Sequence, residues 1–156
     1  MKKNLLINSA VLLFLILFSS CDPHRVYDKS KKITNAEWKI GEQIKFDVQI
    51  DDTLSYHNFF INVRNQGDYS YSNLYFFINT VFPDHKISRD TVECILADEN
   101  GTWLGKGLGD LKDNQILFKK GVRFPKVGLY SFELEQGMYD TTLVGISDIG
   151  IRIEKL

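Results

Sequence analysis

The stretch Ile44–Ile50, with the sequence IKFDVQI, decides the fold class because apolar and polar side chains alternate along it without a break. Successive side chains of a β-strand point to opposite faces, so this period of two predicts a strand with one buried and one exposed face. Similar alternation recurs in further segments, at residues 59–63, 74–78, 92–96, 116–118, 130–134 and 149–153. The sequence therefore predicts a domain that is almost entirely β-structure.

Short polar turns separate these segments. Aspartate, asparagine and glycine, which favour reversals of the chain, gather at residues 51–52, 65–68, 98–101, 120–121 and 127–128. Closely spaced turns of this kind are typical of antiparallel sheets. Because one sheet alone would leave its apolar face in water, we expect an antiparallel two-sheet β-sandwich of about seven to eight strands, of the jelly-roll or immunoglobulin-like sort.

The composition is that of one globular domain, since 44% of the 156 residues are apolar and 25% are charged. A chain of this size buries enough surface to fold without disulfide or metal support. Its 19 Lys and Arg residues are balanced by 20 Asp and Glu residues. This balance argues against nucleic acid as a partner, because nucleic-acid binding needs a basic surface.

The beginning of the chain has the composition of an export signal. Two lysines precede an apolar run at residues 10–18, and two serines follow it. The run is shorter than the ~20 residues that cross a bilayer as a helix, so we expect a signal peptide at residues 1–20 rather than a transmembrane anchor. The string LFSSC, residues 17–21, resembles a bacterial lipobox, in which Cys21 is lipidated and becomes the first residue of the mature chain.

Lipidation of Cys21 predicts a stable membrane anchor, because lipoprotein cysteines carry more than one acyl chain. Ordinary signal cleavage, with Cys21 incidental, is the alternative. Residues 21–37 are predicted to be the lipidated cysteine and a polar tether, and residues 38–156 the β-sandwich domain. Surface-exposed lipoproteins tend to carry an acidic run after the cysteine, and only Asp22 is acidic here. We therefore expect an envelope protein that faces the periplasm.

The second cysteine, Cys94, would be the only free thiol once Cys21 is acylated. A lone thiol in an exported protein can be reactive. Cys94 alternates with Val92 and Leu96, however, which places it on the apolar face of a strand, where cysteine behaves as a small buried hydrophobe. Burial in the core is the favoured interpretation.

The segment Ala97–Asp110, ADENGTWLGKGLGD, is rich in glycine and invites comparison with a phosphate-binding loop. The spacing around Lys106 does not match the Walker pattern, and no helix is expected after it. A hairpin turn at Asp98–Gly101 is the favoured interpretation. Trp103 and Lys106 could also form a partner-binding loop, because a rigid aromatic side chain beside a charge is a common interface anchor.

The segment Tyr69–Pro83 is unusually aromatic and is apolar on both faces of the expected strand. Packing inside the core accounts for this pattern most simply. Tyr71 and Tyr75 share one face and could instead bind a partner or stack against a sugar. The sequence leaves these alternatives open.

No motif for catalysis or metal binding stands out. The histidines lack the i,i+2 or i,i+4 spacing that directs two imidazoles at one metal ion, and no G-x-S-x-G motif occurs. We therefore expect no catalytic residue, no metal and no cofactor. An enzyme acting on envelope polymers would have only unpaired acids available, at Asp98, Glu99 and Asp110.

Several strings together resemble the gliding-motility lipoprotein family GldH. They are YSNLYFFI (71–78), DTVECILAD (90–98), GTWLGKGLG (101–109) and QGMYDTTLVGISDIGIRIEK (136–155), together with the lipobox. The similarity extends over essentially the whole mature chain. The family tail reads Q-x-M-R, whereas Tyr139 takes the place of that arginine here.

The resemblance implies a non-enzymatic envelope lipoprotein, associated with the gliding apparatus and with the type IX secretion pathway. It implies no catalytic residues, and a role in envelope or secretion assembly is the safer statement than motility itself. We therefore expect a lipid-anchored binding or scaffold protein whose partners are the membrane and protein components of this machinery. The alternative is a lipoprotein that binds carbohydrate or peptidoglycan.

Overall fold

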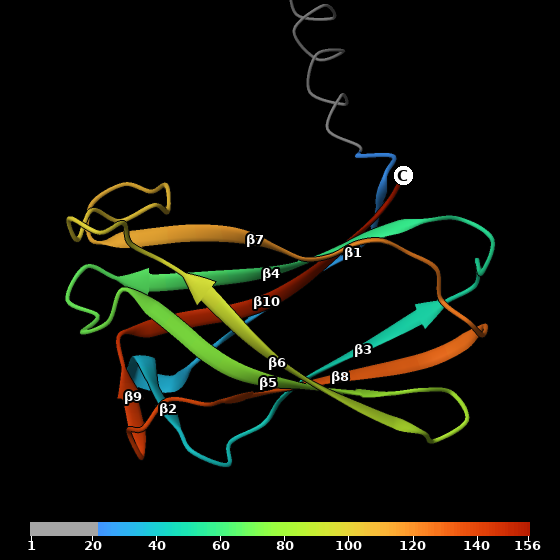
Figure 1. Cartoon of the computed structure of the whole chain (residues 1–156), viewed down its shortest axis with the longest axis horizontal. Coiled ribbons are helices and arrows are strands. Elements are labelled where there is room, and N and C mark those ends of the chain that lie inside the picture. The colour runs from blue at the N-terminus through green and yellow to red at the C-terminus, as the bar shows by residue number, and fades with distance from the viewer. Residues whose placement is uncertain (1–21) are drawn as a thin grey trace, which may run out of the picture.

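The computed structural model describes residues 22–156, so the predicted signal peptide and Cys21 lie outside the described residues. Two four-stranded antiparallel sheets pack face to face (Figure 1). The first sheet has the order β1 (Arg25–Lys32), β10 (Ile146–Lys155), β4 (His57–Gln66) and β7 (Leu111–Val122). The second has the order β3 (Ile44–Ile50), β8 (Gly128–Gln136), β5 (Asn73–Val81) and β6 (Ile87–Ile95).

A short ribbon closes one end of the sandwich. It pairs β2 (Glu37–Lys39) with β9 (Thr142–Val144), and a single 3-10 turn, η1 (Thr34–Ala36), precedes it. The prediction of an antiparallel β-sandwich is confirmed, and the two main sheets contain the eight longer strands. No helix in the described part of the chain is long and apolar enough to cross a membrane.

The core fills the space between the two sheets, as the alternating pattern requires. Strand β3 has the predicted bounds, and its four apolar side chains are all buried. Trp38 and Tyr130 are fully buried, and both satisfy their polar atoms locally: Trp38 Nε1 donates to the Glu42 carbonyl at 2.9 Å, and the Tyr130 hydroxyl donates to the Lys126 carbonyl at 2.9 Å. Large aromatic side chains can therefore enter the core without an unpaired donor.

The predicted tether is wrong for most of its length, because residues 25–32 form β1. Seven residues of β1 pair with β10, from Arg25 opposite Glu154 to Lys32 opposite Asp148. Strand β1 lies at the edge of its sheet, and Tyr27 is its only half-buried residue, whereas the other seven are exposed. A strand that is held mainly by backbone hydrogen bonds carries no apolar periodicity, so the sequence pattern missed it.

The turn predicted at Lys120-Gly121 is also wrong. Both residues belong to β7, where they form an irregularity in the pairing with β4. Gly121 has a positive φ of 60°, and its N–H donates to the Asn58 side chain at 3.1 Å. The glycine therefore serves a β-bulge rather than a reversal of the chain.

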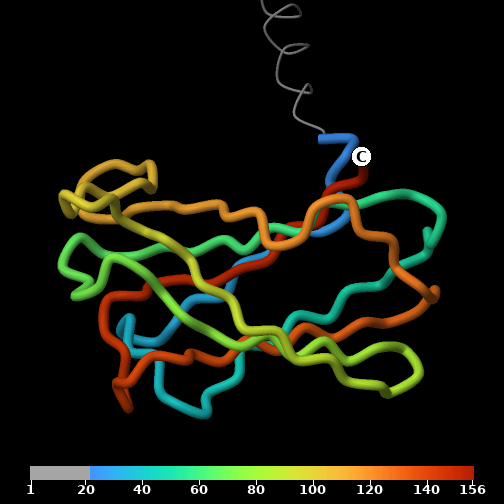
Figure 2. The backbone as a smooth tube through the Cα atoms, in the orientation of Figure 1, coloured from blue at the N-terminus to red at the C-terminus, as the bar shows by residue number. Residues whose placement is uncertain are grey.

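The two ends of the sandwich differ in what they carry. At one end, which we call the terminal end, β10 finishes beside the first described residues, and the β3–β4 and β7–β8 connections cross between the sheets (Figure 2). At the other, which we call the loop end, β10 begins, and the β4–β5 and β6–β7 connections cross (Figure 2). A ten-residue strand rises roughly 33 Å, and this length separates the two ends.

Strand β1 makes a testable contribution to stability. A soluble domain that begins at Ile33 should have a free energy of unfolding about 2–4 kcal/mol lower than one that begins at Asp22, because truncation removes the β10 pairing and the packing of Tyr27. Urea unfolding followed by circular dichroism measures the difference. Lys32→Ala is the control, since it keeps the backbone pairing. Equal stability of the two lengths would show that these residues are a tether after all.

Candidate functional site

The loop between β6 and β7 begins with the predicted hairpin turn. The Asp98 carboxylate accepts the backbone N–H groups of Asn100 and Thr102 at 2.9 and 2.8 Å, and Gly101 takes a positive φ of 78°. Trp103 then pairs with Ala97. The carboxylate of Asp98 is thus used to hold its own turn, which leaves it poorly placed for the acid or base role considered above.

Trp103 and Lys106 are not brought together as a pair. Trp103 is bridged to the end of β6, and its ring lies 6.4 Å from that of Tyr69 at the edge of the core. Lys106 is bridged to Asp113 at the start of β7, in the other sheet, and its side chain is exposed. The loop therefore links the two sheets, and only its tryptophan joins the aromatic cluster of the loop end.

The aromatic segment divides between core and surface according to strand parity. Leu74, Phe76 and Ile78 are fully buried, whereas Tyr71 and Tyr75 are 36% and 38% exposed. The core interpretation is correct for the first set. The second set stays available for a partner, which the sequence alone could not decide.

Tyr71 and Tyr75 both contact the loop that follows β8. The Tyr71 hydroxyl donates to the Asp140 carboxylate at 2.7 Å, and the Tyr75 N–H donates to the Met138 sulfur at 3.2 Å. Tyr139 lies between Met138 and Asp140 in the sequence, and its side chain is fully exposed. We call Tyr71, Tyr75 and Tyr139 the tyrosine surface.

Tyr69 packs beneath one ring of the tyrosine surface, that of Tyr71. The Tyr69 ring packs against that of Tyr71 at 5.7 Å, and its hydroxyl donates to the Asn73 carbonyl at 2.9 Å. Tyr69 in turn lies against Gly145, where a Cβ would come within 3.0 Å of the Tyr69 backbone. The Tyr71 ring therefore rests on Tyr69, which is itself packed against the chain just before β10.

Carboxylates border the tyrosine surface. The hydrogen bond to Asp140 raises the pKa of Tyr71, and that to Glu93 raises the pKa of Tyr75. Both phenols therefore stay neutral and donate to these acids at physiological pH. The arrangement is suited to recognition, because rigid amphipathic rings lose little conformational entropy on binding.

Sequence reasoning did not select Tyr139 as a site residue. Its signal was present, since tyrosine replaces the family arginine at this position, but nothing in the sequence placed it between Tyr71 and Tyr75. That arrangement depends on the loop after β8 returning beside β5, where the Gly137 N–H donates to the Tyr75 carbonyl at 2.8 Å. Long-range contacts of this kind leave no local pattern.

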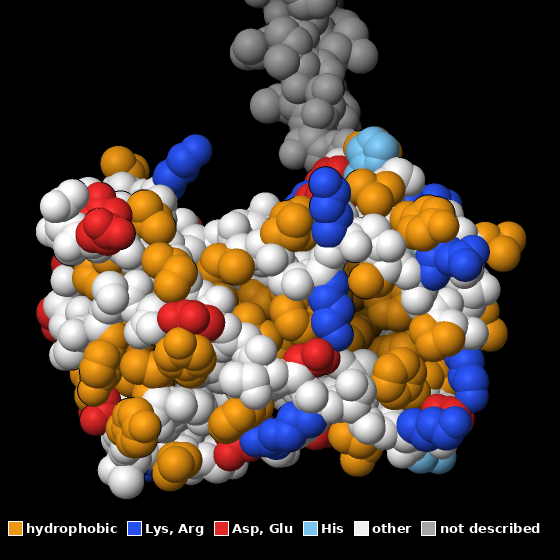
Figure 3. Space-filling model, in the orientation of Figure 1, with side chains coloured by type: hydrophobic (Ala, Val, Ile, Leu, Met, Phe, Trp, Pro, Cys, Tyr) orange, Lys and Arg blue, Asp and Glu red, His pale blue; other side chains and the backbone are white. Residues whose placement is uncertain are grey.

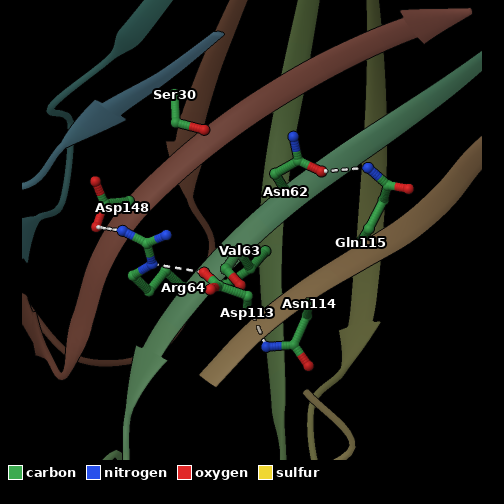
Figure 4. Close-up of a pocket in the computed structure, with 8 residues that line it drawn as sticks. All are labelled: Ser30, Asn62, Val63, Arg64, Asp113, Asn114, Gln115 and Asp148. Carbon is green, nitrogen blue, oxygen red and sulfur yellow. Dashed lines mark hydrogen bonds and ion pairs between the residues drawn. The ribbon is translucent and has the colours of Figure 1, made fainter. Parts of the chain in front are cut away.

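A polar depression of about 270 Å³ lies on the outer face of the first sheet (Figure 4). Arg64 Nε donates to Asp113 at 2.5 Å, and its Nη1 lies 3.6 Å from the Asp148 carboxylate. Gln115 donates to the Asn62 side-chain oxygen at 3.2 Å. These groups satisfy one another across β10, β4 and β7, so a ligand bound here would have to break contacts that already exist.

In the described part of the chain, no group of three or more His, Cys, Asp or Glu side chains is placed to bind a metal ion. His57 is buried with its ring edge against Phe124, 5.3 Å between centroids, and its Nδ1 has no hydrogen-bond partner. Cys94 is fully buried, as the strand pattern predicted.

The GldH lipoprotein family model matches residues 25–153, from the first residue of β1 into β10. The chain belongs to the GldH lipoprotein family. A gliding motility lipoprotein GldH homolog from Christiangramia forsetii is 39% identical over 148 residues, covering 90% of each chain. The gliding motility lipoprotein GldH of Flavobacterium johnsoniae is 32% identical over 156 residues, covering 95% of this chain and 96% of its own. No solved structure matches the chain significantly.

Membership of the GldH family confirms the resemblance seen in the sequence. It places the chain among membrane-associated lipoproteins of the cell envelope. The matched region includes all of β1 and reaches into β10, so the GldH domain begins close to the predicted lipidation site.

The Cys94 thiol should be unreactive in the folded protein. Burial raises its pKa to about 12, so only about one thiol in ten thousand is ionised at pH 8. In a Cys21→Ser variant, Cys94 is the only cysteine, and its reaction with a disulfide reagent should be at least about a hundredfold slower in the folded state than in urea. Comparable rates in the two states would contradict a structural role for Cys94.

Proposed function

We propose that the chain is a lipid-anchored, non-enzymatic binding and scaffold component of the envelope machinery for gliding motility and type IX secretion. The names of the two relatives support the link to gliding motility. The lipobox resemblance supports acylation of Cys21, by which the protein would be held in the membrane and face the periplasm.

The tyrosine surface is the observation that carries this proposal. Exposed aromatic side chains with anchored backbones are typical of the energetic centre of protein interfaces. Tyr139 is fully exposed, and its neighbours Met138 and Asp140 are fixed by contacts with β5 and Tyr71. A partner that covers these rings would remove apolar area from water while the bordering acids keep their hydrogen bonds.

The position of the tyrosine surface suits an anchored scaffold. It lies at the loop end, whereas the first described residues lie at the terminal end, beside the last residues of β10. With the lipid attached at Cys21, the length of β10 would hold the tyrosine surface roughly 33 Å from the anchor. A partner protein could then reach it without displacing the domain from the membrane.

Carbohydrate or peptidoglycan binding is the second candidate, and the exposed rings of Tyr71, Tyr75 and Tyr139 favour it. Sugar faces stack on such rings. The rings come from two different loops and a strand, however, and the polar depression that could supply hydrogen bonds lies on the other sheet. Failure of the purified domain to bind peptidoglycan or a glycan array would remove this candidate.

A site-specific crosslink tests the scaffold proposal. A photoreactive amino acid at Tyr139 of the acylated chain, expressed in its own host, should capture gliding or secretion components. The same probe at Val127, which is 60% exposed near the terminal end, should not. Replacing Tyr71, Tyr75 and Tyr139 together by alanine should reduce co-purification of these components by about tenfold or more. Unchanged co-purification with the triple variant would refute the site.

Purification of the Cys21→Ala chain supplies the control for the anchor. The folded domain should then appear in the soluble fraction, and components whose capture depends on the membrane position should be lost. Recovery of the same components with and without Cys21 would show that the anchor has no part in assembly.

A further inference from the structure

The terminal end of the sandwich exposes apolar side chains beside a basic one. Leu54, Tyr56 and Leu156 are 81%, 53% and 61% exposed. They are neighbours in space, because the Leu156 N–H donates to the Tyr56 carbonyl at 2.9 Å and Leu54 stands two residues before Tyr56. The guanidinium of Arg123 lies over the Tyr56 ring, 5.3 Å from its centroid. We call these four residues the terminal patch.

Arg123 is free to meet an external anion. It is exposed, and it forms no ion pair with a carboxylate in the described part of the chain. Its position over an aromatic ring keeps the charge at the surface. A tyrosine, two leucines and an arginine together have the composition that is enriched where proteins meet lipid headgroups.

The chain enters the domain next to this patch. Arg152 binds the Asp22 carboxylate, and the Arg25 N–H donates to the Asp22 carbonyl at 3.3 Å. The His24 carbonyl accepts the Lys155 N–H at 2.8 Å, one residue before Leu156. The first described residue is thus already fixed to the fold beside the C-terminus, where hydrophobic and basic side chains lie together (Figure 3).

This attachment leaves almost no slack between the proposed lipid and the domain. Cys21 is joined directly to Asp22, and each residue spans at most about 3.6 Å. A flexible tether of a dozen residues would let the domain diffuse away from the bilayer, whereas a clamp at Asp22 holds it within a few ångströms. The surface around the clamp therefore meets the bilayer whenever the acyl chains are inserted.

We propose that the terminal patch is a membrane-binding surface that lies against the phospholipid headgroups. The proposal rests on the acylation of Cys21 given above. Leu54, Tyr56 and Leu156 insert at the boundary between headgroups and acyl chains, and Arg123 pairs with lipid phosphates. The acyl chains supply the attachment, and the patch fixes the orientation. The last residues of β10 then lie nearest the membrane, and its first residues and the tyrosine surface lie farthest from it.

Spin labels on the full acylated chain test the orientation. Leu54→Cys and Leu108→Cys variants are labelled and reconstituted in vesicles of phosphatidylethanolamine with about a third phosphatidylglycerol. The label at residue 54 should be about tenfold less accessible to an aqueous nickel reagent than the label at residue 108, which is 98% exposed near the loop end. The buried Cys94 should not take the label.

A Tyr56→Asp, Leu156→Asp double variant supplies the second measurement. Its acyl chains should keep it on the vesicles, but the label at residue 54 should become as accessible as that at residue 108. Mass spectrometry of the same samples reports the acyl groups on Cys21. If the residue 54 label is fully accessible in the acylated chain that keeps Tyr56 and Leu156, the patch alone is overturned. A chain without acyl groups would overturn the anchor and the patch together.

Discussion

Strand β10 is constrained on both edges and both faces, and the rest of the sandwich depends on it. Its edges pair with β1 and β4, and its inward isoleucines at 149, 151 and 153 are fully buried. On the outer face Arg152 binds Asp22, Asp28 and Glu154. At Gly150 a Cβ would come within 2.7 Å of the Lys29 carbonyl oxygen, so β1 can approach only because this residue has no side chain. One strand therefore fixes the sheet, the core and the first described residues together.

The fold could be predicted wherever burial left a pattern in the sequence. Strand β3 alternates because one of its faces packs against the core and the other meets water, and its bounds were recovered from this alternation. Strand β1 gives no such signal, because an edge strand of mostly polar residues, RVYDKSKK, is held mainly by backbone hydrogen bonds to β10. The composition that suggested a tether is the composition that keeps an exposed edge soluble and unpaired with other chains.

The candidate site was only partly predictable for a related reason. Tyr71 and Tyr75 could be picked out because their segment is unusually aromatic and is apolar on both faces of the expected strand, and Trp103 because glycines surround it. Lys106 was grouped with Trp103 by proximity in sequence, but the loop crosses from one sheet to the other between them. Tyr139 joins the surface through contacts between β5 and the loop after β8, which only the folded chain brings together. Tertiary contacts, rather than local propensity, assemble this end of the molecule.

The contact between Asp22 and Arg152 also depends on the charge of both groups. Arg152 lowers the pKa of Asp22, and the three surrounding acids raise the pKa of Arg152, so both partners stay charged at neutral pH. A carboxyl with a lowered pKa stabilises the fold above its ordinary pKa, and this contribution is lost only as the pH falls below that value. The ion pair between Asp22 and Arg152 is therefore present at neutral pH. Because the ion pair is partly exposed, salt weakens it more readily than mild acid does. The backbone pairing of β1 with β10 therefore contributes most to holding the first described residues in place.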